Sequence, residues 1–260
     1  MEDRRLAQPE RPASGVPGRS PERERGAGGP SPYPLTREEA EAMARRAAQA
    51  LDIRPIPTPH PRLVLMVGLP GTGKSTLARR LAAALPAPIV ESDRVRRVLF
   101  KWPRHSLQES RRVHQVCRVL LEQLLRQGSS AIFDATNLIE AHRALVYQIA
   151  DRLRIPLIIL LVTAPPEVVR DRLEGRLRHR DPTDASEATW PVYERMRRQM
   201  EPIGRPYLEV DTSRDLEALL PELVQAIRQP AWPLPGLPSV PRSPAEEGQG
   251  PGNPSLEGSR

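Results

Sequence analysis

The stretch GLPGTGKST, residues 68 to 76, contains residue types that can hold a phosphate group. It fits the pattern G-x-x-x-x-G-K-[ST] at every fixed position. The glycines let the backbone wrap an anion with its N–H groups, and a helix that begins here would point its N-terminus at the same anion. Lys74 can reach the β- and γ-phosphates of a nucleotide, and the Ser75 hydroxyl can ligate Mg²⁺. The nucleotide-binding residues expected from this stretch are Gly68, Leu69, Pro70, Gly71, Thr72, Gly73, Lys74, Ser75 and Thr76.

A second polar group follows the next apolar run, in the stretch VESDRVRR at residues 90 to 97. Ser92 and Asp93 are both good helix caps, and a cap contributes about 1 kcal/mol. At the end of a parallel strand, however, the Asp93 carboxylate could accept the proton of an attacking hydroxyl. Arg96 lies three residues later and would face the same way, where it could hold an acceptor or a phosphate. The position of Asp93 in the chain leaves the cap and the base both open.

The third apolar run ends in FDATN, residues 133 to 137. Asp134 stands where a carboxylate commonly orients Mg²⁺ or its water ligands. Thr136 and Asn137 could instead serve as caps for the helix that follows. The sequence therefore gives Asp134 as a candidate metal ligand. It leaves two interpretations for Asn137, a helix cap or a residue that binds the substrate.

Arginines are concentrated later in the chain, between residues 168 and 188. Arg172, Arg176, Arg178 and Arg180 come at the end of a predicted helix, before a polar loop. Such a run is often only a solvated face. In a phosphoryl-transfer fold, a mobile arginine loop can also bring positive charge to the transferring group and exclude water. We favour the second interpretation, because the run follows the fourth predicted strand, from which it can overhang the phosphate site.

These residues depend on a succession of strands and helices for their positions. Short apolar runs predict five strands, at residues 62–68, 88–92, 130–137, 155–164 and 206–211. Helical patterns separate them, at residues 76–85, 94–100, 107–127, 139–153, 165–178 and 186–200, and a last helix covers 215–229. Strands that alternate with helices predict an α/β fold with a parallel sheet covered on both faces. Ligands of such sheets bind beyond the carboxyl ends of the strands, where the polar groups above lie.

The chain outside this region has a different composition. Most of its 31 prolines lie in residues 1–34, 55–61 and 230–260. We expect 1–34 and 230–260 to be disordered tails, because they have too little apolar surface to offset the entropy of ordering. Residues 35–61 predict a helix, which Thr36 and Glu39 begin in capping-box spacing, and then a stiff proline-rich linker. This leaves 62–229 as one domain.

Charge and hydropathy indicate which partners and which cellular location to expect. The formal charge is +7, and Lys74 and Lys101 are the only lysines. Arginine spread along helices and tails favours a compositional bias over a nucleic-acid surface, and 3% aromatic residues offer few stacking platforms. The single cysteine, Cys117, is expected in the core. With no apolar leader, and a longest apolar run at 155–164 that is about half of a membrane span, we expect a cytoplasmic protein without membrane contact.

Taken together, five motifs resemble a known family. GLPGTGKST, ESDRVR, FDATNL with HR five residues on, RDRLEGR and VDTS are similar, in this order, to the P-loop kinases of the polynucleotide-kinase and small-molecule-kinase group. The likeness covers residues 62 to 228. Zeta-type toxins and antibiotic phosphotransferases share the same core with other acceptors.

The resemblance implies a three-layer P-loop NTPase fold with strand order 2-3-1-4-5, ATP and Mg²⁺ as cofactors, and transfer of the γ-phosphate to a hydroxyl. It implies that Lys74 and Ser75 serve the phosphates and the metal. The further roles that it implies are Asp93 as general base, Arg96 on the acceptor side, Asp134 and Asn137 at the D-x-T-N position, Arg172 and Arg176 as lid arginines, and Thr212 and Ser213 beside the adenine.

Three functions remain open at this point. The first is an ATP-dependent kinase whose acceptor is a small metabolite, a nucleoside-type compound or a polynucleotide 5′ end. The second is an ATP-binding switch or adaptor with no acceptor, and the third is nucleic-acid binding by the arginine-rich surface. The residues Phe100, Trp102 and His105 are candidate lining of an acceptor pocket, whose ligand the sequence does not identify.

Overall fold

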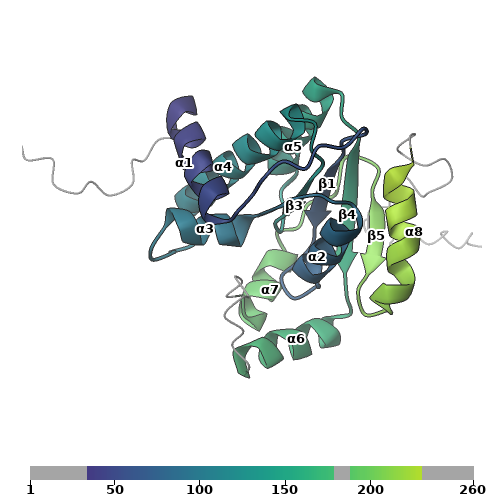
Figure 1. Cartoon of the computed structure of the whole chain (residues 1–260). Helices are drawn as coiled ribbons and strands as arrows, with labels where there is room; N and C mark the ends of the chain where they lie inside the picture. The colour runs from purple at the N-terminus through teal and green to yellow at the C-terminus, as the bar shows by residue number, and fades with distance from the viewer. Residues whose placement is uncertain (1–33, 179–187, 230–260) are drawn as a thin grey trace, which may run out of the picture. The chain divides into compact units, whose positions relative to one another are not determined.

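The computed structural model describes residues 34–178 and 188–229 (Figure 1). The strands are β1 (Leu63–Val67), β2 (Ile89–Glu91), β3 (Ala131–Asp134), β4 (Leu157–Thr163) and β5 (Leu208–Asp211). The helices are α1 (Arg37–Ala50), α2 (Lys74–Ala84), α3 (Ser92–Leu99), α4 (Leu107–Arg126), α5 (Glu140–Leu153), α6 (Pro166–Arg178), α7 (Trp190–Arg197) and α8 (Leu216–Arg228). The predicted tails, Pro34 apart, lie outside the described residues.

The strands form one parallel sheet in the order β2-β3-β1-β4-β5, which confirms the predicted fold class and strand order. β1 is the central strand, and all five of its residues are buried, as expected of a strand covered on both faces. Leu65 pairs with Phe133 on one side and with Ile159 on the other. All carboxyl ends therefore meet at one edge of the sheet.

Side chains alternate between two cores along each strand, which gives the three layers (Figure 1). Leu65 and Phe133 face the core that α1, α3, α4 and α5 cover. Met66 and Ile132 face the core that α2 and α8 cover. A third, smaller cluster joins α6 and α7 to the loop after β1.

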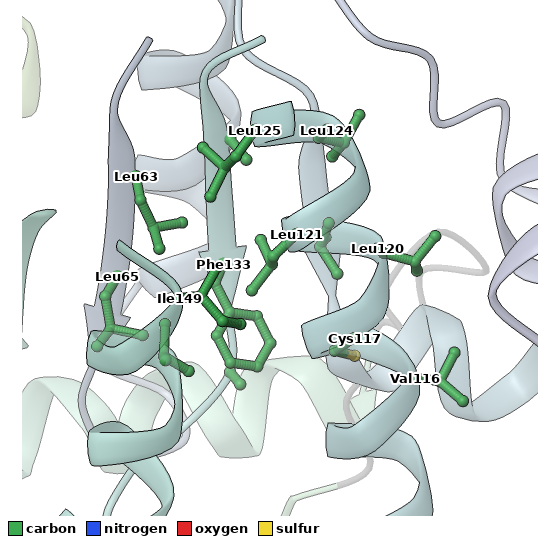
Figure 2. Close-up of a cluster of buried hydrophobic side chains, with 14 of the residues drawn as sticks. Leu63, Leu65, Val116, Cys117, Leu120, Leu121, Leu124, Leu125, Phe133 and Ile149 are labelled. Atoms are coloured by element: carbon green, nitrogen blue, oxygen red, sulfur yellow. The ribbon is translucent and has the colours of Figure 1, made fainter. Parts of the chain in front are cut away.

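The long helix α4 has the apolar stripe that the sequence predicts. Val113, Val116, Leu120 and Leu124 are all buried, and Figure 2 shows this helix beside β3. Cys117 is also buried, and burial raises the pKa of its thiol to about 12. It is a core residue, as expected.

The N-terminal helix α1 packs on the same core through Ala40, Ala44 and Ala47. Its predicted capping box is present, because Thr36 accepts from the Glu39 N–H and Glu39 accepts from the Thr36 N–H. Within the described ranges, 34–178 and 188–229, no helix is both long and apolar enough to cross a bilayer.

Removal of this cap should weaken the attachment of α1. We expect Thr36→Ala to lower the free energy of unfolding by about 1 kcal/mol in urea denaturation, because one helix donor loses its acceptor. Arg45→Ala is the matched control: this side chain is exposed on α1, and alanine favours a helix. Equal stability of the two variants would show that the capping box contributes nothing.

Candidate active site

The loop between β1 and α2 has the backbone that a phosphate cradle needs. Gly71 and Gly73 have φ of 80° and 85°, a left-handed conformation that favours glycine. Gly73 is the N-cap of α2, and a Cβ atom there would lie 3.0 Å from the Thr212 hydroxyl oxygen. The first N–H groups of α2 have no partner within the helix and are available to an anion. The loop is therefore fitted to a nucleotide phosphate.

Lys74 is the first residue of α2, and its side chain is buried. Its Nζ donates to the Leu69 carbonyl at 2.7 Å, across the loop. Burial lowers the pKa of Lys74, while the nearby carboxylates of Asp134 and Asp93 act in the opposite direction. Its ammonium group is thus held among the groups that the sequence assigns to metal binding and proton transfer.

The Thr212 hydroxyl is hydrogen-bonded to the phosphate loop. It donates to the Thr72 carbonyl at 2.7 Å and accepts from Arg172 Nη1 at 2.8 Å. Arg172 Nη2 also donates to the Thr212 carbonyl at 2.8 Å. Two residues expected to contact the nucleotide are therefore bonded to each other under the loop. Ser213 is exposed and donates to the Asp211 carboxylate.

The predicted lid arginines lie on α6. Arg176 is close enough to Lys74 for its charge to lower the pKa of that ammonium group. Arg178 is exposed, and its Nε lies 3.5 Å from the Glu174 carbonyl. Arg180 lies outside the described residues. Arg172 and Arg176 thus lie near the phosphate loop, whereas the exposed Arg178 side chain lies against its own helix.

Asp93 is not the cap of α3, so that interpretation of the sequence is wrong. The N-cap is Glu91, and Asp93 lies in the first turn. The reason is that β2 ends at Glu91 and α3 follows at once. Burial raises the pKa of the Asp93 carboxyl, and Arg96, His105 and Lys74 act against that rise. A partly desolvated carboxylate beside cations matches a proton acceptor better than a cap.

Arg96 is held by a residue that sequence reasoning missed. Its Nη1 donates to Glu109 Oε1 at 2.6 Å, and both side chains are buried. Its Nε lies 3.9 Å from Asp93 Oδ1. Glu109 also accepts from the Arg104 N–H at 2.8 Å. Glu109 on α4 thus holds the Arg96 guanidinium within ion-pair distance of Asp93.

Asp134 is buried at the end of β3. Among the described residues, its Oδ2 has no hydrogen-bond partner. Burial raises the pKa of this carboxyl, and Lys74 and a hydrogen bond with Ser75 act in the opposite direction. An orphaned carboxylate oxygen beside a serine hydroxyl fits the oxygen ligands that Mg²⁺ takes in such sites. Asp134 and Ser75 would hold that ion.

A second acid at this edge was not predicted. Glu91 is the register partner of Asp134. Burial and the charge of Asp134 raise the pKa of Glu91 to about 7. The signal in the sequence was its place as the last residue of a strand, directly before Ser92 and Asp93. In this stretch, chemistry was predicted for Asp93 and Arg96 but not for Glu91.

The structure excludes one of the two interpretations of Asn137, the helix cap. Ile139 is the N-cap of α5, so the prediction that Thr136 or Asn137 caps this helix is wrong. Asn137 has a φ of 47°, is buried, and donates from Nδ2 to the Met66 carbonyl at 2.8 Å. Arg143, which is fully buried, donates to the Asn137 carbonyl at 2.7 Å. The loop after β3 is therefore tied to β1 and to α5.

The three candidate lining residues are separated. His105 lies near enough to Asp93 to lower its pKa. Phe100 packs against the core, whereas Trp102 is 77% exposed. Only His105 is thus brought near the predicted base.

A known domain family matches most of this architecture. The model described as "AAA domain" matches residues 63–203, which is more than half of the chain and includes the phosphate loop, Asp93 and Asp134. The chain belongs to this family. The family is consistent with the P-loop kinase group that the motifs resemble.

Solved structures share the fold of this AAA domain. The APS kinase CysC of Mycobacterium tuberculosis, in complex with AMPPNP and APS, is 18% identical, with a TM-score of 0.52 over 66% of this chain and 100% of that chain. Kti12 of Chaetomium thermophilum, in complex with ADP-AlF3, is 22% identical, with a TM-score of 0.52 over 65% of this chain and 100% of that chain. Both of these proteins have a P-loop fold, and both were solved with a bound nucleotide or nucleotide analogue.

One curated relative matches a short stretch of this chain. The shikimate kinase of Corynebacterium glutamicum is 61% identical over 31 residues, 12% of this chain. The match spans 18% of that kinase.

The close approach of Gly73 to Thr212 should be essential for nucleotide binding. Alanine in a left-handed conformation costs about 1 to 2 kcal/mol, so Gly73→Ala should lower stability by that amount. It should also weaken ATP binding about tenfold or more in calorimetry, because the added Cβ displaces the loop from Thr212.

Gly128→Ala separates strain from crowding. Gly128 has a φ of 71°, but an added Cβ would meet no atom within 4 Å. This control should lose similar stability and keep its ATP affinity. If both variants bound ATP equally well, the packing of Gly73 on Thr212 would have no part in binding.

Proposed function

We propose that this AAA-domain protein is a Mg²⁺- and ATP-dependent kinase that transfers the γ-phosphate to an acceptor hydroxyl. The observation that carries the proposal is the place of Asp93, in the first turn of α3 directly after β2, at the edge of the sheet where Glu91 pairs with Asp134. The charge of Lys74 acts to lower the pKa of Asp93, in keeping with that place. This place supports a proton acceptor at the rim of the phosphate loop, where an incoming hydroxyl would meet the phosphate. A nucleotide switch would need the loop but no such carboxylate.

The protein side of the reaction follows from the site. Bound Mg²⁺–ATP would supply the phosphoryl group and the positive charge that offsets its oxygens. Lys74 and the N–H groups of the loop orient the phosphates, and Ser75 and Asp134 hold the metal. Asp93 takes the proton from the acceptor hydroxyl at its carboxylate. Arg176 adds positive charge beside the phosphates.

Further residues act by holding this set in place. Arg96 fixes Asp93 through its own bond to Glu109. Arg172 and Thr212 hold the phosphate loop against the ends of β4 and β5. Asn137 ties the loop after β3 to β1. These residues preorganise the site and do not need to touch the acceptor.

Asp93→Asn tests the base directly. The amide keeps the shape of the side chain but cannot accept a proton near neutral pH, so phosphoryl transfer should fall about 10²-fold or more. ATP affinity and the thermal unfolding midpoint should stay unchanged. Transfer is measured with radiolabelled ATP against sugars, nucleosides, aminoglycosides and 5′-hydroxyl oligonucleotides.

Asp151→Asn is the control for that variant, because Asp151 pairs with Arg205 on the surface of α5. It should keep full transfer activity. Equal turnover of the Asp93 and Asp151 variants would remove Asp93 from the chemistry. Intact ATP binding with no labelled product from any acceptor would support the switch instead.

Asp134→Asn tests the metal site. An amide oxygen is a weaker Mg²⁺ ligand than a carboxylate, so the gain in ATP affinity that Mg²⁺ gives should fall about tenfold or more. Calorimetry with ATP in Mg²⁺ and in EDTA measures this gain. An unchanged gain would show that Asp134 does not serve the metal.

A further inference from the structure

Arg143 on α5 is fully buried, although its guanidinium carries a charge. A buried N–H donor without an acceptor is costly, and a guanidinium has several such donors. The Arg143 donors meet one carboxylate and four backbone carbonyls, which come from two separate segments. We call this group the Arg143 clamp; its acceptors are Glu140 Oε2 (2.6 Å) and the carbonyls of Asn137 (2.7 Å), Leu138 (2.8 Å), Glu201 (2.9 Å) and Pro202.

The clamp joins two segments that lie far apart in the sequence. One is the loop after β3, which continues from the proposed metal ligand Asp134, and the other is 199–204, which follows α7. The Glu201 N–H donates to the Leu138 carbonyl at 3.0 Å, directly between the two segments. The Glu140 N–H donates to Glu201 Oε2 at 2.6 Å. Both segments are therefore fastened to each other and to the start of α5.

The loop after β3 connects the clamp to the phosphate loop. The Gly68 N–H, at the start of the phosphate loop, donates to the Thr136 carbonyl at 3.1 Å. Leu138 belongs to the same apolar cluster as Leu69, the next residue of the phosphate loop. A displacement of this loop would therefore disturb both Asp134 and the start of the phosphate loop.

The segment 199–204 connects the clamp to α6 and α7. We call these two helices the arginine arm, because α6 carries Arg176, to which we assign positive charge beside the phosphates. Val169 of α6 and Tyr193 of α7 lie in one apolar cluster. A Cβ atom at Gly71 would lie only 2.8 Å from Val169 Cγ1, so α6 is packed against the phosphate loop. The arginine arm therefore contacts the phosphate loop at one end and continues into the clamp at the other.

We infer that Arg143 is a positioning residue for phosphoryl transfer: it holds the arginine arm at a fixed place relative to the metal-binding end of β3. This inference rests on the proposed function for the transfer step. Arg143 acts through other residues, since its donors are all directed at groups of the protein itself. An arginine is required here, because the single ammonium group of a lysine cannot reach acceptors on both segments with the geometry of a planar fork.

The transfer step depends on the place of the arm. The acceptor O–H gives its proton to Asp93, and its oxygen forms a bond to the γ-phosphorus. The bond from that phosphorus to the bridging oxygen breaks, and ADP leaves with the electron pair. Asp134, which would hold the metal, and Arg176 would serve the oxygens of the transferring group from different segments. A misplacement of about 1 Å can cost about 10²-fold in rate, so the clamp fixes a distance that matters for kcat.

Trp190 reports the place of the arm without any transfer. It is the first residue of α7, and its ring stacks on Tyr193 with the centroids 4.8 Å apart. The guanidinium carbon of Arg170, on α6, lies 5.1 Å from the centroid of the Trp190 ring. The full-length protein is therefore labelled with fluorotryptophan and studied by fluorine NMR, and Trp190→Phe assigns the signal.

We expect Arg143→Lys to shift or broaden the Trp190 signal and to leave the signal of Trp102, in the exposed loop after α3, unchanged. Arg205→Lys is the matched control. Arg205 directly follows the segment 199–204 and pairs with Asp151 of α5, but both side chains are exposed, and such pairs contribute little. An unchanged Trp190 signal in Arg143→Lys, or an equal change in Arg205→Lys, would overturn the inference.

Gly204→Ala disturbs the clamp without removing a charge. Gly204 is exposed, and an added Cβ atom would lie 2.6 Å from Glu140 Oε1, so the Glu140 carboxylate that Arg143 binds must move. We expect the Trp190 signal to change here as well. If Arg143→Lys does not fold, an unchanged Trp190 signal in Gly204→Ala overturns the inference by itself.

Transfer from labelled ATP then shows whether the clamp serves the chemistry. We expect kcat to be about 10- to 100-fold lower in Arg143→Lys, with a similar KM for ATP, because the clamp acts on the transition state and not on nucleotide binding. Arg176→Gln should also lower kcat. The double variant should lose much less than the product of the two single losses, because the clamp acts through the arm that carries Arg176. Losses that multiply would show a general effect on stability and would overturn the inference.

The kinase and the clamp can fail separately. A changed Trp190 signal in Arg143→Lys, with no product from any acceptor in the wild-type protein, would support the junction and contradict the kinase. Product from the wild-type protein with an equal kcat in Arg143→Lys would support the kinase and overturn the role of Arg143.

Discussion

The Thr212 hydroxyl joins the segments on which the site depends. The hydroxyl donates to the Thr72 carbonyl in the phosphate loop and accepts from Arg172 on α6. The Thr212 backbone N–H donates to the Thr163 carbonyl at the end of β4. A Cβ atom at position 73 would lie only 3.0 Å from the Thr212 hydroxyl oxygen, so the lack of a side chain at Gly73 lets the loop lie this close to Thr212. The bond to the Thr72 carbonyl is buried, so it is protected from water and costly to leave unmade. The phosphate loop is thus fixed before any ligand binds.

Around this fixed loop, the structure concentrates charge that is only partly compensated. Glu91, Asp93 and Asp134 have raised pKa values, and Lys74 has a lowered one, with burial as the first cause in each case. Buried groups of this kind destabilise a domain unless they are paired, and they are typical of functional sites. Mg²⁺ and a nucleotide would supply the missing opposite charges.

The apolar frame could be predicted almost entirely from the sequence. Residues such as Leu65 and Phe133 lie in short apolar runs, which are typical of strands covered on both faces. Because helical segments separate these runs along the chain, the sequence predicted that the strands are parallel. The resemblance supplied the strand order. The stripe from Val113 to Leu124 on α4 followed in the same way from helical periodicity. These features are local, or repeat along the chain, so they are readable without knowledge of what packs against them.

The sequence by itself determined the phosphate loop and the candidate polar residues, because their chemistry depends on type and spacing. Only the tertiary structure decided their partners. Arg96 turns to Glu109, thirteen positions away along the chain, and Asn137 turns to the Met66 carbonyl. Asp93 is not a cap, because β2 pairs with β3 as far as Glu91 and α3 begins at the next residue. Such choices arise when segments distant in sequence pack together, since a buried polar group takes whichever partner the packing brings to it.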